Sequence, residues 1–233
     1  MHHFWGIRQG ADVALLEDEA HHAHKVLRLN DGDVVRVLDG LGSAWEGPLH
    51  FLGKRGAVVA RARELPSYGS VSGCFHLVIA PTKNMDRIEW LLEKAVELGV
   101  HRVSLVECAR SERRHLKLDR LVRLMQAACK QSQKGMLPEL DGPTPFSERM
   151  ASTKGRCALA ALRPESAYLP ELIRAAPNEP WTVFIGPEGD FTDAEISEAQ
   201  AHGAVLVGLG PHRLRTETAG LYAVAAFAQR LSL

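Results

Sequence analysis

The spacing of apolar residues changes near residue 70, which divides the chain into two stretches. In the first stretch, strand-like runs follow a short helical pattern over 20–29. The runs occupy residues 33–38, 43–52 and 57–64 and are separated by glycine-containing turns at 39–42 and 53–56. We therefore predict a small β-rich domain over residues 1–68.

In the second stretch, apolar strands alternate with amphipathic helices. The predicted strands lie at 74–80, 103–106, 157–162, 181–184 and 204–207. The predicted helices lie at 85–99, 117–133, 166–175, 192–202 and 217–231. Such alternation is typical of a parallel sheet covered by helices on both faces. We therefore predict an α/β domain over residues 74–233, which a Ser- and Gly-rich linker joins to the first domain.

The last predicted helix is apolar around most of its circumference. Ala219, Leu221, Tyr222, Val224 and Phe227 lie on several of its sides. A helix of this kind must be buried, either in its own domain or against a partner chain. The sequence leaves both alternatives open.

Composition places the chain among globular proteins, and the distribution of charge says more than its total. The 28 basic and 28 acidic residues balance, and 45% of the residues are hydrophobic. Between residues 102 and 134, however, there are nine Lys or Arg residues and three acids. Lys117, Arg120 and Arg123 recur there at helical spacing. This basic segment is either a solvated helix face or a surface for nucleic-acid phosphates.

Three further features limit the possible functions. The four cysteines are widely spaced and form no Cys-x-x-Cys pair, which predicts free thiols in a reducing cytoplasm. No apolar run approaches the roughly 18 residues of a membrane-spanning helix, and no hydrophobic leader opens the chain. His21, His22 and His24 lie close together, but no Cys or carboxylate pair accompanies them at ligand spacing. We therefore expect a cytoplasmic protein without a metal or a membrane anchor.

Candidate chemistry gathers in two glycine-containing loops of the last third, at 185–191 and 208–219. Each loop follows an apolar strand and leads into a helix, so both leave the carboxyl ends of strands, where open α/β sheets hold ligands. Gly-Pro after a strand is also a common turn. The charges of Glu188, Arg213 and Arg215 exceed what turns require, which favours a single ligand pocket.

The two loops carry the strings Ile185-Gly-Pro-Glu-Gly, Leu209-Gly-Pro and Leu214-Arg-Thr-Glu-Thr-Ala219. Shorter matches are His22, Val26-Leu-Arg28, Lys83, Glu89-Trp90, Lys94-Ala95, Glu97-Leu-Gly-Val100, Ala127-Ala-Cys, Gln131-Ser132 and Pro138-Glu139. Together these residues resemble the RsmE-type small-subunit rRNA uridine-N3 methyltransferases of the SPOUT superfamily. The resemblance covers nearly the whole chain, and the Leu-Arg-Thr-Glu-Thr-Ala string beside a Gly-Pro-Glu-Gly loop is highly specific.

Three positions depart from the family pattern. Asp190 stands where a second glycine is usual, Lys130 where a glutamate is usual, and Ala109 where a glutamate precedes Arg-Ser. The last two departures put an acidic role at those positions in doubt. Aspartate tolerates the left-handed backbone region better than most residues, so we expect the loop at Asp190 to keep its shape.

The resemblance implies both a fold and an activity. The fold would be a SPOUT domain with a trefoil knot, preceded by a PUA-like RNA-binding barrel, in a homodimer that packs its last helices together. The activity would be methyl transfer from S-adenosylmethionine to N3 of a uridine in the decoding region of 16S rRNA, presented by the assembled 30S subunit. The family positions around the cofactor are Leu162, Ile185, Gly186, Glu188, Gly189, Leu209, Gly210, Leu214, Arg215 and Thr216.

Methylation at N3 needs a base, because this nitrogen carries a proton, but it needs no metal, because a sulfonium methyl is itself electrophilic. Glu188 and Glu217 are the acids within the matching loops, and Arg215 would offset negative charge on the uracil carbonyls. Either acid could instead cap a helix or pair with an arginine. The expected RNA contacts are His22, Arg28, Lys83, Arg110, Arg113 and Arg114.

Three alternatives remain at this point. A SPOUT enzyme of other specificity, for ribose 2′-O or for tRNA, would share the knot but is disfavoured by the match of both domains. An RNA-binding protein without catalysis would keep the fold, and Asp190 and Lys130 favour it. A nucleotide-dependent oxidoreductase would need a third glycine in Gly208-x-Gly210-x-x-Arg213. A test of which cofactor binds distinguishes the oxidoreductase from a methyltransferase. A test of methyl transfer distinguishes the RNA-binding protein without catalysis from an enzyme.

Overall fold

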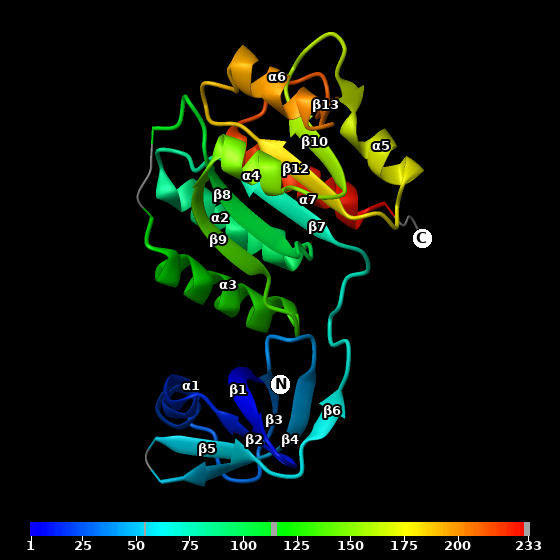
Figure 1. Ribbon diagram of the computed structural model, residues 1–233. Helices are drawn as coiled ribbons and strands as arrows, with labels where there is room; N and C mark the ends of the chain where they lie inside the picture. Colours follow the sequence, from blue (N-terminus) through cyan, green and yellow to red (C-terminus); the bar gives the residue numbers. More distant parts are fainter. Residues whose placement is uncertain (54, 113–115, 231–233) are drawn as a thin grey trace. The chain divides into compact units, whose positions relative to one another are not determined.

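A computed structural model describes residues 1–53, 55–112 and 116–230 of the chain (Figure 1). The chain forms two compact units. The first contains Met1–Ser70 and Gln126–Leu137, and the second contains Val71–Met125 and Pro138–Leu233. The segment Gln126–Leu137 thus joins the first unit, whereas the sequence pattern leaves it in the second domain.

The first unit is built around a closed barrel of five strands. These are β1 (His3–Gln9), β2 (Asp12–Leu15), β3 (Val34–Leu38), β4 (Ala44–Leu52) and β5 (Gly56–Val59). Their order is β3-β1-β2-β5-β4, and a further pairing of β3 with β4 closes the barrel. The short strand β6 (Arg63–Leu65) adds to β4. The prediction of a small β-barrel domain is confirmed.

Two glycines let the barrel strands approach one another closely. A Cβ atom at Gly47 in β4 would lie 2.8 Å from Cγ1 of Val59, and one at Gly6 in β1 would lie 2.4 Å from the carbonyl oxygen of Ala14. Alternate residues of the strands point their side chains into the barrel. The resulting core includes Phe4, Val13, Val35, Val37, Trp45, Leu49 and Val59.

Two predicted elements of the first unit are interrupted. The run at 57–64 breaks into β5 and β6, because Arg61 between them takes a positive φ of 47°. The helical pattern at 20–29 becomes α1 (Glu17–His21) followed directly by a π-helical turn, η1 (His22–Val26). Arg28 then takes a positive φ of 54°, a position after a helix that glycine usually occupies.

The second unit contains a seven-stranded sheet in which every pairing is parallel. Its order is β11-β13-β10-β12-β7-β8-β9. The strands are β7 (Phe75–Ile79), β8 (Arg102–Glu107), β9 (Glu139–Pro145), β10 (Arg156–Ala160), β11 (Ala167–Tyr168), β12 (Trp181–Ile185) and β13 (Val205–Gly208). The sequence pattern misses β9, because Gly142, Pro143 and Pro145 are typical of turns and are tolerated only at a sheet edge.

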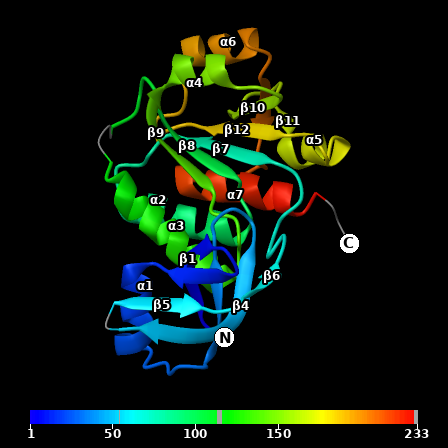
Figure 2. The same cartoon turned by 60° about the horizontal axis from the view of Figure 1, so that its bottom comes forward.

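Helices cover both faces of this sheet, which confirms the predicted α/β architecture (Figures 1 and 2). One face carries α4 (Phe146–Ser152) and α6 (Asp193–Ala201), and the other carries α2 (Met85–Glu97), α5 (Leu169–Ala175) and α7 (Thr216–Ala228). Beneath α4 and α6 the core includes Val78, Val106, Phe146, Leu159, Phe184 and Phe191. The remaining helix, α3 (Leu118–Ser132), begins in the second unit and ends in the first.

The last helix is buried along one side within its own unit. The buried positions include Ala219, Gly220, Ala223, Val224 and Phe227, whereas Leu221, Tyr222 and Ala225 are half-buried. β13 lies toward one edge of the sheet, while α7 packs against the central strands β7 and β12, so the chain crosses the sheet between them. The trefoil knot stays a prediction.

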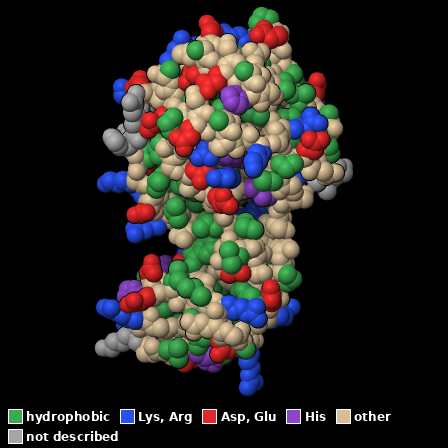
Figure 3. Space-filling view, in the orientation of Figure 1, with side chains coloured by type: hydrophobic (Ala, Val, Ile, Leu, Met, Phe, Trp, Pro, Cys, Tyr) green, Lys and Arg blue, Asp and Glu red, His purple; other side chains and the backbone are tan. Residues whose placement is uncertain are grey.

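The surface of the second unit mixes both signs of charge. Figure 3 shows basic and acidic side chains interspersed over the visible face, so no large area of one sign dominates it. Lys117, Arg120 and Arg123 are exposed, and Arg120 pairs with Glu89 of α2 at 2.8 Å. None of the helices in the described ranges is long and apolar enough to cross a membrane.

Candidate functional site

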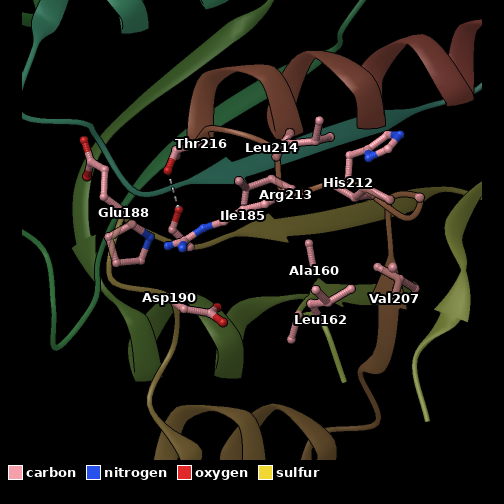
Figure 4. A pocket seen from close by; sticks show the side chains of 17 residues that line it. Ala160, Leu162, Ile185, Glu188, Asp190, Val207, His212, Arg213, Leu214 and Thr216 are labelled. Atoms are coloured by element: carbon pink, nitrogen blue, oxygen red, sulfur yellow. Dashed lines mark hydrogen bonds between the residues drawn. The ribbon is translucent and has the colours of Figure 1, made fainter. Parts of the chain in front are cut away.

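A pocket of about 380 Å³ lies at the carboxyl ends of β10, β12 and β13 (Figure 4). Because β10 lies between β12 and β13, the loops that follow these three parallel strands leave the same edge of the sheet. The lining residues are Ala160, Ala161, Leu162, Ile185, Gly186, Pro187, Glu188, Asp190, Val207, Gly208, Leu209, Gly210, His212, Arg213, Leu214, Thr216 and Ala219. The two glycine-containing loops therefore line one common pocket.

The loop after β12 is a tight turn closed by its own backbone. The Asp190 N–H donates to the Pro187 carbonyl at 2.9 Å, and Asp190 has a positive φ of 63°. The Phe191 N–H donates to Oδ1 of Asp190 at 2.8 Å. Glycine would adopt this conformation without strain, whereas for aspartate it is unfavourable by about 1 kcal/mol. The loop keeps a turn at the position where Asp190 departs from the family pattern.

A neighbouring turn after β8 braces this loop. Arg110 Nη1 donates to the Gly189 carbonyl at 2.7 Å and to the Phe191 carbonyl at 3.5 Å. The adjacent Ala109 N–H donates to Oε1 of Glu195 at 2.8 Å. Glu195 is buried and also completes the capping box at the start of α6. Ala109 departs from the family pattern, and its backbone N–H, not a side chain, binds Glu195.

The loop after β13 has a backbone that favours glycine. Gly210 has a φ of 117°, and an added Cβ there would meet no atom within 4 Å, so backbone strain rather than space restricts this position. His212 and Arg213 line the pocket on this side. The two loops are joined where Oγ1 of Thr216, in the first turn of α7, donates to the Gly186 carbonyl at 3.2 Å.

The two candidate bases lie in different surroundings. Glu188 lines the pocket, and its Oε1 accepts the Lys83 N–H at 3.3 Å. Glu217 does not line the pocket; its Oε1 lies 3.7 Å from Arg87 Nε, and its Oε2 is buried without a hydrogen-bond partner among the described residues. Arg215 is the exposed N-cap residue of α7 and lies outside the lining.

Eight of the ten positions that the resemblance implies around the cofactor line the pocket, while Gly189 and Arg215 do not. The structure adds Asp190, His212 and Arg213 as charged or titratable lining residues. The sequence contained a signal for Asp190, because it replaces a usual glycine beside a matching motif. His212 carried no comparable signal in the sequence, and it lines the pocket because it lies in the loop after β13.

The residues expected to contact RNA are divided between the two units. His22 and Arg28 are exposed in the first unit, and Lys83 is exposed after β7 in the second, with its Nζ 3.2 Å from Glu112. Arg110 braces the loop after β12, as described above. Arg113 and Arg114 lie outside the described residues.

Other candidate chemistry is limited. In the described part of the chain, no group of His, Cys, Asp or Glu side chains could hold a metal ion. Lys130, another departure from the family pattern, pairs with Glu19 within the first unit at 2.5 Å. Burial raises the pKa of Cys108, Cys129 and Cys157 to about 12, so these thiols are poor nucleophiles.

Family models match both units of the chain. One described as an RNA methyltransferase domain matches residues 73–228, and one described as an RNA methyltransferase PUA domain matches residues 15–59. Among curated proteins, the chain is 32% identical to Ribosomal RNA small subunit methyltransferase E of Synechocystis, over 92% of this chain and 72% of that protein.

Solved structures of similar proteins share the whole architecture. A probable rRNA-methyltransferase from Porphyromonas gingivalis is 33% identical, with a TM-score of 0.86 over 96% of this chain and 95% of that one. Ribosomal RNA small subunit methyltransferase E from Neisseria gonorrhoeae, bound to S-adenosyl methionine, is 26% identical, with a TM-score of 0.86 over 97% and 96%. The chain therefore belongs to the RNA methyltransferase family that includes the small-subunit ribosomal RNA methyltransferases E.

Proposed function

We propose that this protein transfers a methyl group from S-adenosylmethionine to N3 of a uridine in the decoding region of 16S rRNA, within the assembled 30S subunit. The pocket at the carboxyl edge of the sheet carries the proposal, because eight positions that match the family's cofactor site line it. Membership of the family in both domains supports rRNA as the substrate class. The related Neisseria gonorrhoeae protein binds the same cofactor.

The pocket suits this cofactor in size and in chemical character. Its volume of about 380 Å³ lies within the range of small-molecule sites. Leu162, Ile185 and Leu214 would supply apolar contacts for the adenine, while amides and carbonyls of the two loops would bind its edges. Arg213 also lines the pocket and would pair with the carboxylate of the methionine part. The cofactor supplies an electrophilic methyl group, so the protein has to hold donor and acceptor in line.

Removal of the N3 proton is the other task, and Glu188 is better placed for it than Glu217. Glu188 lies at the rim of the pocket, and the Lys83 N–H holds one of its carboxylate oxygens (Figure 4). Glu217 faces Arg87 of α2 instead, so we assign it a role in positioning the first turn of α7. Arg215, exposed at the N-cap of α7, would stabilise negative charge on the uracil carbonyls.

Exposed basic residues would position the RNA. In the first unit these are His22 and Arg28, and in the second they include Lys83 and Arg110. Arg113 and Arg114, which lie outside the described residues, would extend the same basic segment of the sequence. Arg28 keeps a left-handed backbone that glycine would adopt more easily, which supports a role for its side chain. Phosphate contacts of this kind would leave selectivity to RNA shape and to the exposed base.

We also propose a homodimer built on the half-buried side of α7. Leu221, Tyr222 and Ala225 lie there, and the hydroxyl of Tyr222 is 2.7 Å from that of Tyr168, a residue that is 40% exposed. A twofold axis would let two copies of this surface cover one another. Light scattering should then give twice the chain mass of 25.6 kDa, and a monomer at working concentration would contradict the proposal.

Methyl transfer to small subunits tests the function directly. The protein is incubated with labelled S-adenosylmethionine and 30S subunits from cells that lack it, and the modified nucleoside is identified by mass spectrometry. We expect N3-methyluridine in 16S rRNA and no such product from Glu188→Gln, with cofactor binding retained. Label in a ribose, or transfer only to tRNA offered in a parallel reaction, would indicate another specificity, and cofactor binding without any transfer would contradict catalysis. The reaction would take place in the cytoplasm, where the subunit is assembled.

A further inference from the structure

The pocket carries opposite charges on its two loops. The acids Glu188 and Asp190 come from the loop after β12, whereas the positive charge of Arg213 comes from the loop after β13. In Figure 4 the Asp190 carboxylate points toward Leu162 across the pocket, while Glu188 lies at the rim. Asp190 is therefore the acid that a ligand inside the pocket would meet.

The side chain of Asp190 is not needed to form its loop. The turn is closed by the backbone bond from the Asp190 N–H to the Pro187 carbonyl, which any residue except proline could donate. The φ of 63° would suit the glycine that is usual at this position, and aspartate makes that conformation less favourable. Oδ1 also accepts the Phe191 N–H, a contact that an asparagine would preserve. The distinctive contribution of Asp190 is thus a negative charge in the pocket.

A carboxylate here acts differently on the two forms of the cofactor. During transfer, the bond between the methyl carbon and sulfur breaks, its electron pair stays on sulfur, and the methyl carbon bonds to N3 as the N3 proton passes to the base. The sulfonium cation becomes a neutral thioether, so one positive charge leaves the bound cofactor. A nearby carboxylate attracts S-adenosylmethionine more strongly than S-adenosylhomocysteine, because only the former carries that charge.

We propose that Asp190 is a specificity-determining residue that makes the pocket prefer S-adenosylmethionine over the product S-adenosylhomocysteine. This inference rests on the proposed function, because it assumes this cofactor. The preference reduces product inhibition, since the product loses an attraction that the incoming substrate retains. Two unit charges about 6 Å apart in a solvated site interact by roughly 1 kcal/mol, which corresponds to about a fivefold change in affinity.

Calorimetric titration of the two ligands tests the proposal without relying on activity. Dissociation constants for S-adenosylmethionine and S-adenosylhomocysteine are measured for the wild type, Asp190→Asn and Asp190→Gly. Asparagine tolerates the left-handed backbone and keeps the acceptor for Phe191, so it removes only the charge. We expect both variants to bind S-adenosylmethionine about fivefold more weakly and S-adenosylhomocysteine within about twofold of the wild type. The difference should shrink at high salt.

A matched variant shows whether the effect comes from the charge inside the pocket or from the net charge of the protein. Asp193→Asn makes the same chemical change in the first turn of α6, where the side chain is 94% exposed, pairs with Arg163 at 2.8 Å and does not line the pocket. It should leave the ratio of the two dissociation constants unchanged. Thermal melting should also show that Asp190→Gly is no less stable than the wild type, because glycine relieves the unfavourable φ.

Two results would overturn the inference. Equal losses of affinity for S-adenosylmethionine, S-adenosylhomocysteine and 5′-methylthioadenosine would mean that Asp190 binds the shared adenosine part. Unchanged affinities in both Asp190 variants would mean that its charge has no influence on binding. A wild-type protein that binds none of these ligands would instead contradict the proposed function, so the two failures are distinguishable.

Discussion

The two edges of the seven-stranded sheet use polar side chains in opposite ways. At the carboxyl edge, the loops after β10, β12 and β13 present charged side chains to an open pocket. At the amino edge, polar side chains of β7, β8, β9 and α4 bond to one another. The comparison shows which part of this fold is available to a ligand and which part holds neighbouring strands together.

The amino-edge cluster consists of His76, Arg102, Ser104, Asp141 and Arg149. Nε2 of His76 lies 2.7 Å from Oγ of Ser104, which donates to Oδ2 of Asp141. Arg102 Nε donates to the same oxygen at 2.7 Å, and Arg149 lies 3.4 Å from it. Burial raises the pKa of Asp141, but the hydrogen bonds from Arg102 and Ser104 outweigh this effect and lower it overall. Each charged group in the cluster therefore has a partner.

The largest expected effect is a loss of stability in acid that comes from His76. Burial, followed by the charges of Arg102 and Arg149, lowers the pKa of His76 from 6.5 to about 4, although Asp141 acts in the opposite direction. Between pH 6.5 and about 4, His76 is therefore protonated in the unfolded chain but neutral in the folded chain. The free energy of unfolding should be fully retained above pH 6.5 and fall by up to about 3 kcal/mol as the pH drops to about 4.

Chemical denaturation across this pH range measures the effect, with His76→Gln as the comparison. Glutamine can still hydrogen-bond to Ser104 but does not titrate, so its stability profile should be flatter between pH 6.5 and 4. Parallel profiles for the two proteins would show that His76 is not the responsible group.

Removal of Asp141 should have the next largest effect, and it should leave the pocket unaffected. Asp141→Asn deprives Arg102 and Arg149 of their shared carboxylate, so we expect a loss of about 2 kcal/mol in unfolding free energy, because the pair is only partly buried. Glu179→Gln removes an exposed pair with Arg156 and should leave stability almost unchanged, because water screens such a pair. A large fall in cofactor affinity for Asp141→Asn would show that the amino edge also contributes to ligand binding, contrary to the comparison above.

At the carboxyl edge, Gly210→Ala should weaken cofactor binding more than it lowers stability. A side chain at a φ of 117° is unfavourable by about 1–3 kcal/mol, and the exposed loop can relieve this strain by moving away from the pocket. We expect roughly a tenfold loss of affinity for S-adenosylmethionine by calorimetry. Gly203→Ala provides the control, since Gly203 has a φ of 83° with open space around it but lies outside the pocket. Equal affinities in the two variants would argue that the loop after β13 does not shape the site.

The smallest expected effect concerns the brace on the other loop. Arg110→Ala removes the hydrogen bonds to Gly189 and Phe191, and we expect cofactor affinity to fall about threefold to fivefold, or roughly 1 kcal/mol. Arg110→Lys retains a donor and should recover part of this loss. Lys154→Ala, an exposed basic residue away from the loop, should leave the affinity unchanged. An effect of Arg110→Ala confined to the KM for 30S subunits would show that Arg110 serves RNA binding alone.

Sequence periodicity predicted the buried central strands better than the edge strands, for a physical reason. Buried parallel strands such as β7 and β12 are almost continuous apolar runs, each interrupted by one polar residue, so their pattern is visible without knowing their neighbours. The edge strand β9 depends on pairing with β8, and its prolines conceal it. The break at Arg61 has the same origin, because its N–H is bound by the distant Asp12.

The candidate site divides in a similar way. Gly-Pro loops after apolar strands identified the two walls of the pocket, since strand ends and turns are local features. The directions of Glu188 and Glu217 were not predictable, because both are acids in matching loops and only packing against α2 turns Glu217 toward Arg87. The contact between Arg110 and Gly189 joins residues far apart in the chain, so no local pattern indicates it.

By itself, the sequence determined the alternation of apolar strands and helices in the second unit, the two glycine-containing loops and the family resemblance, because these follow from local spacing and residue type. Only the tertiary structure decided the strand order β11-β13-β10-β12-β7-β8-β9, which brings the ends of β12 and β13 to either side of β10. It also decided that Asp190 lines the pocket and that Glu217 does not. These outcomes depend on contacts between distant residues, which come into existence only when the sheet and its covering helices have packed.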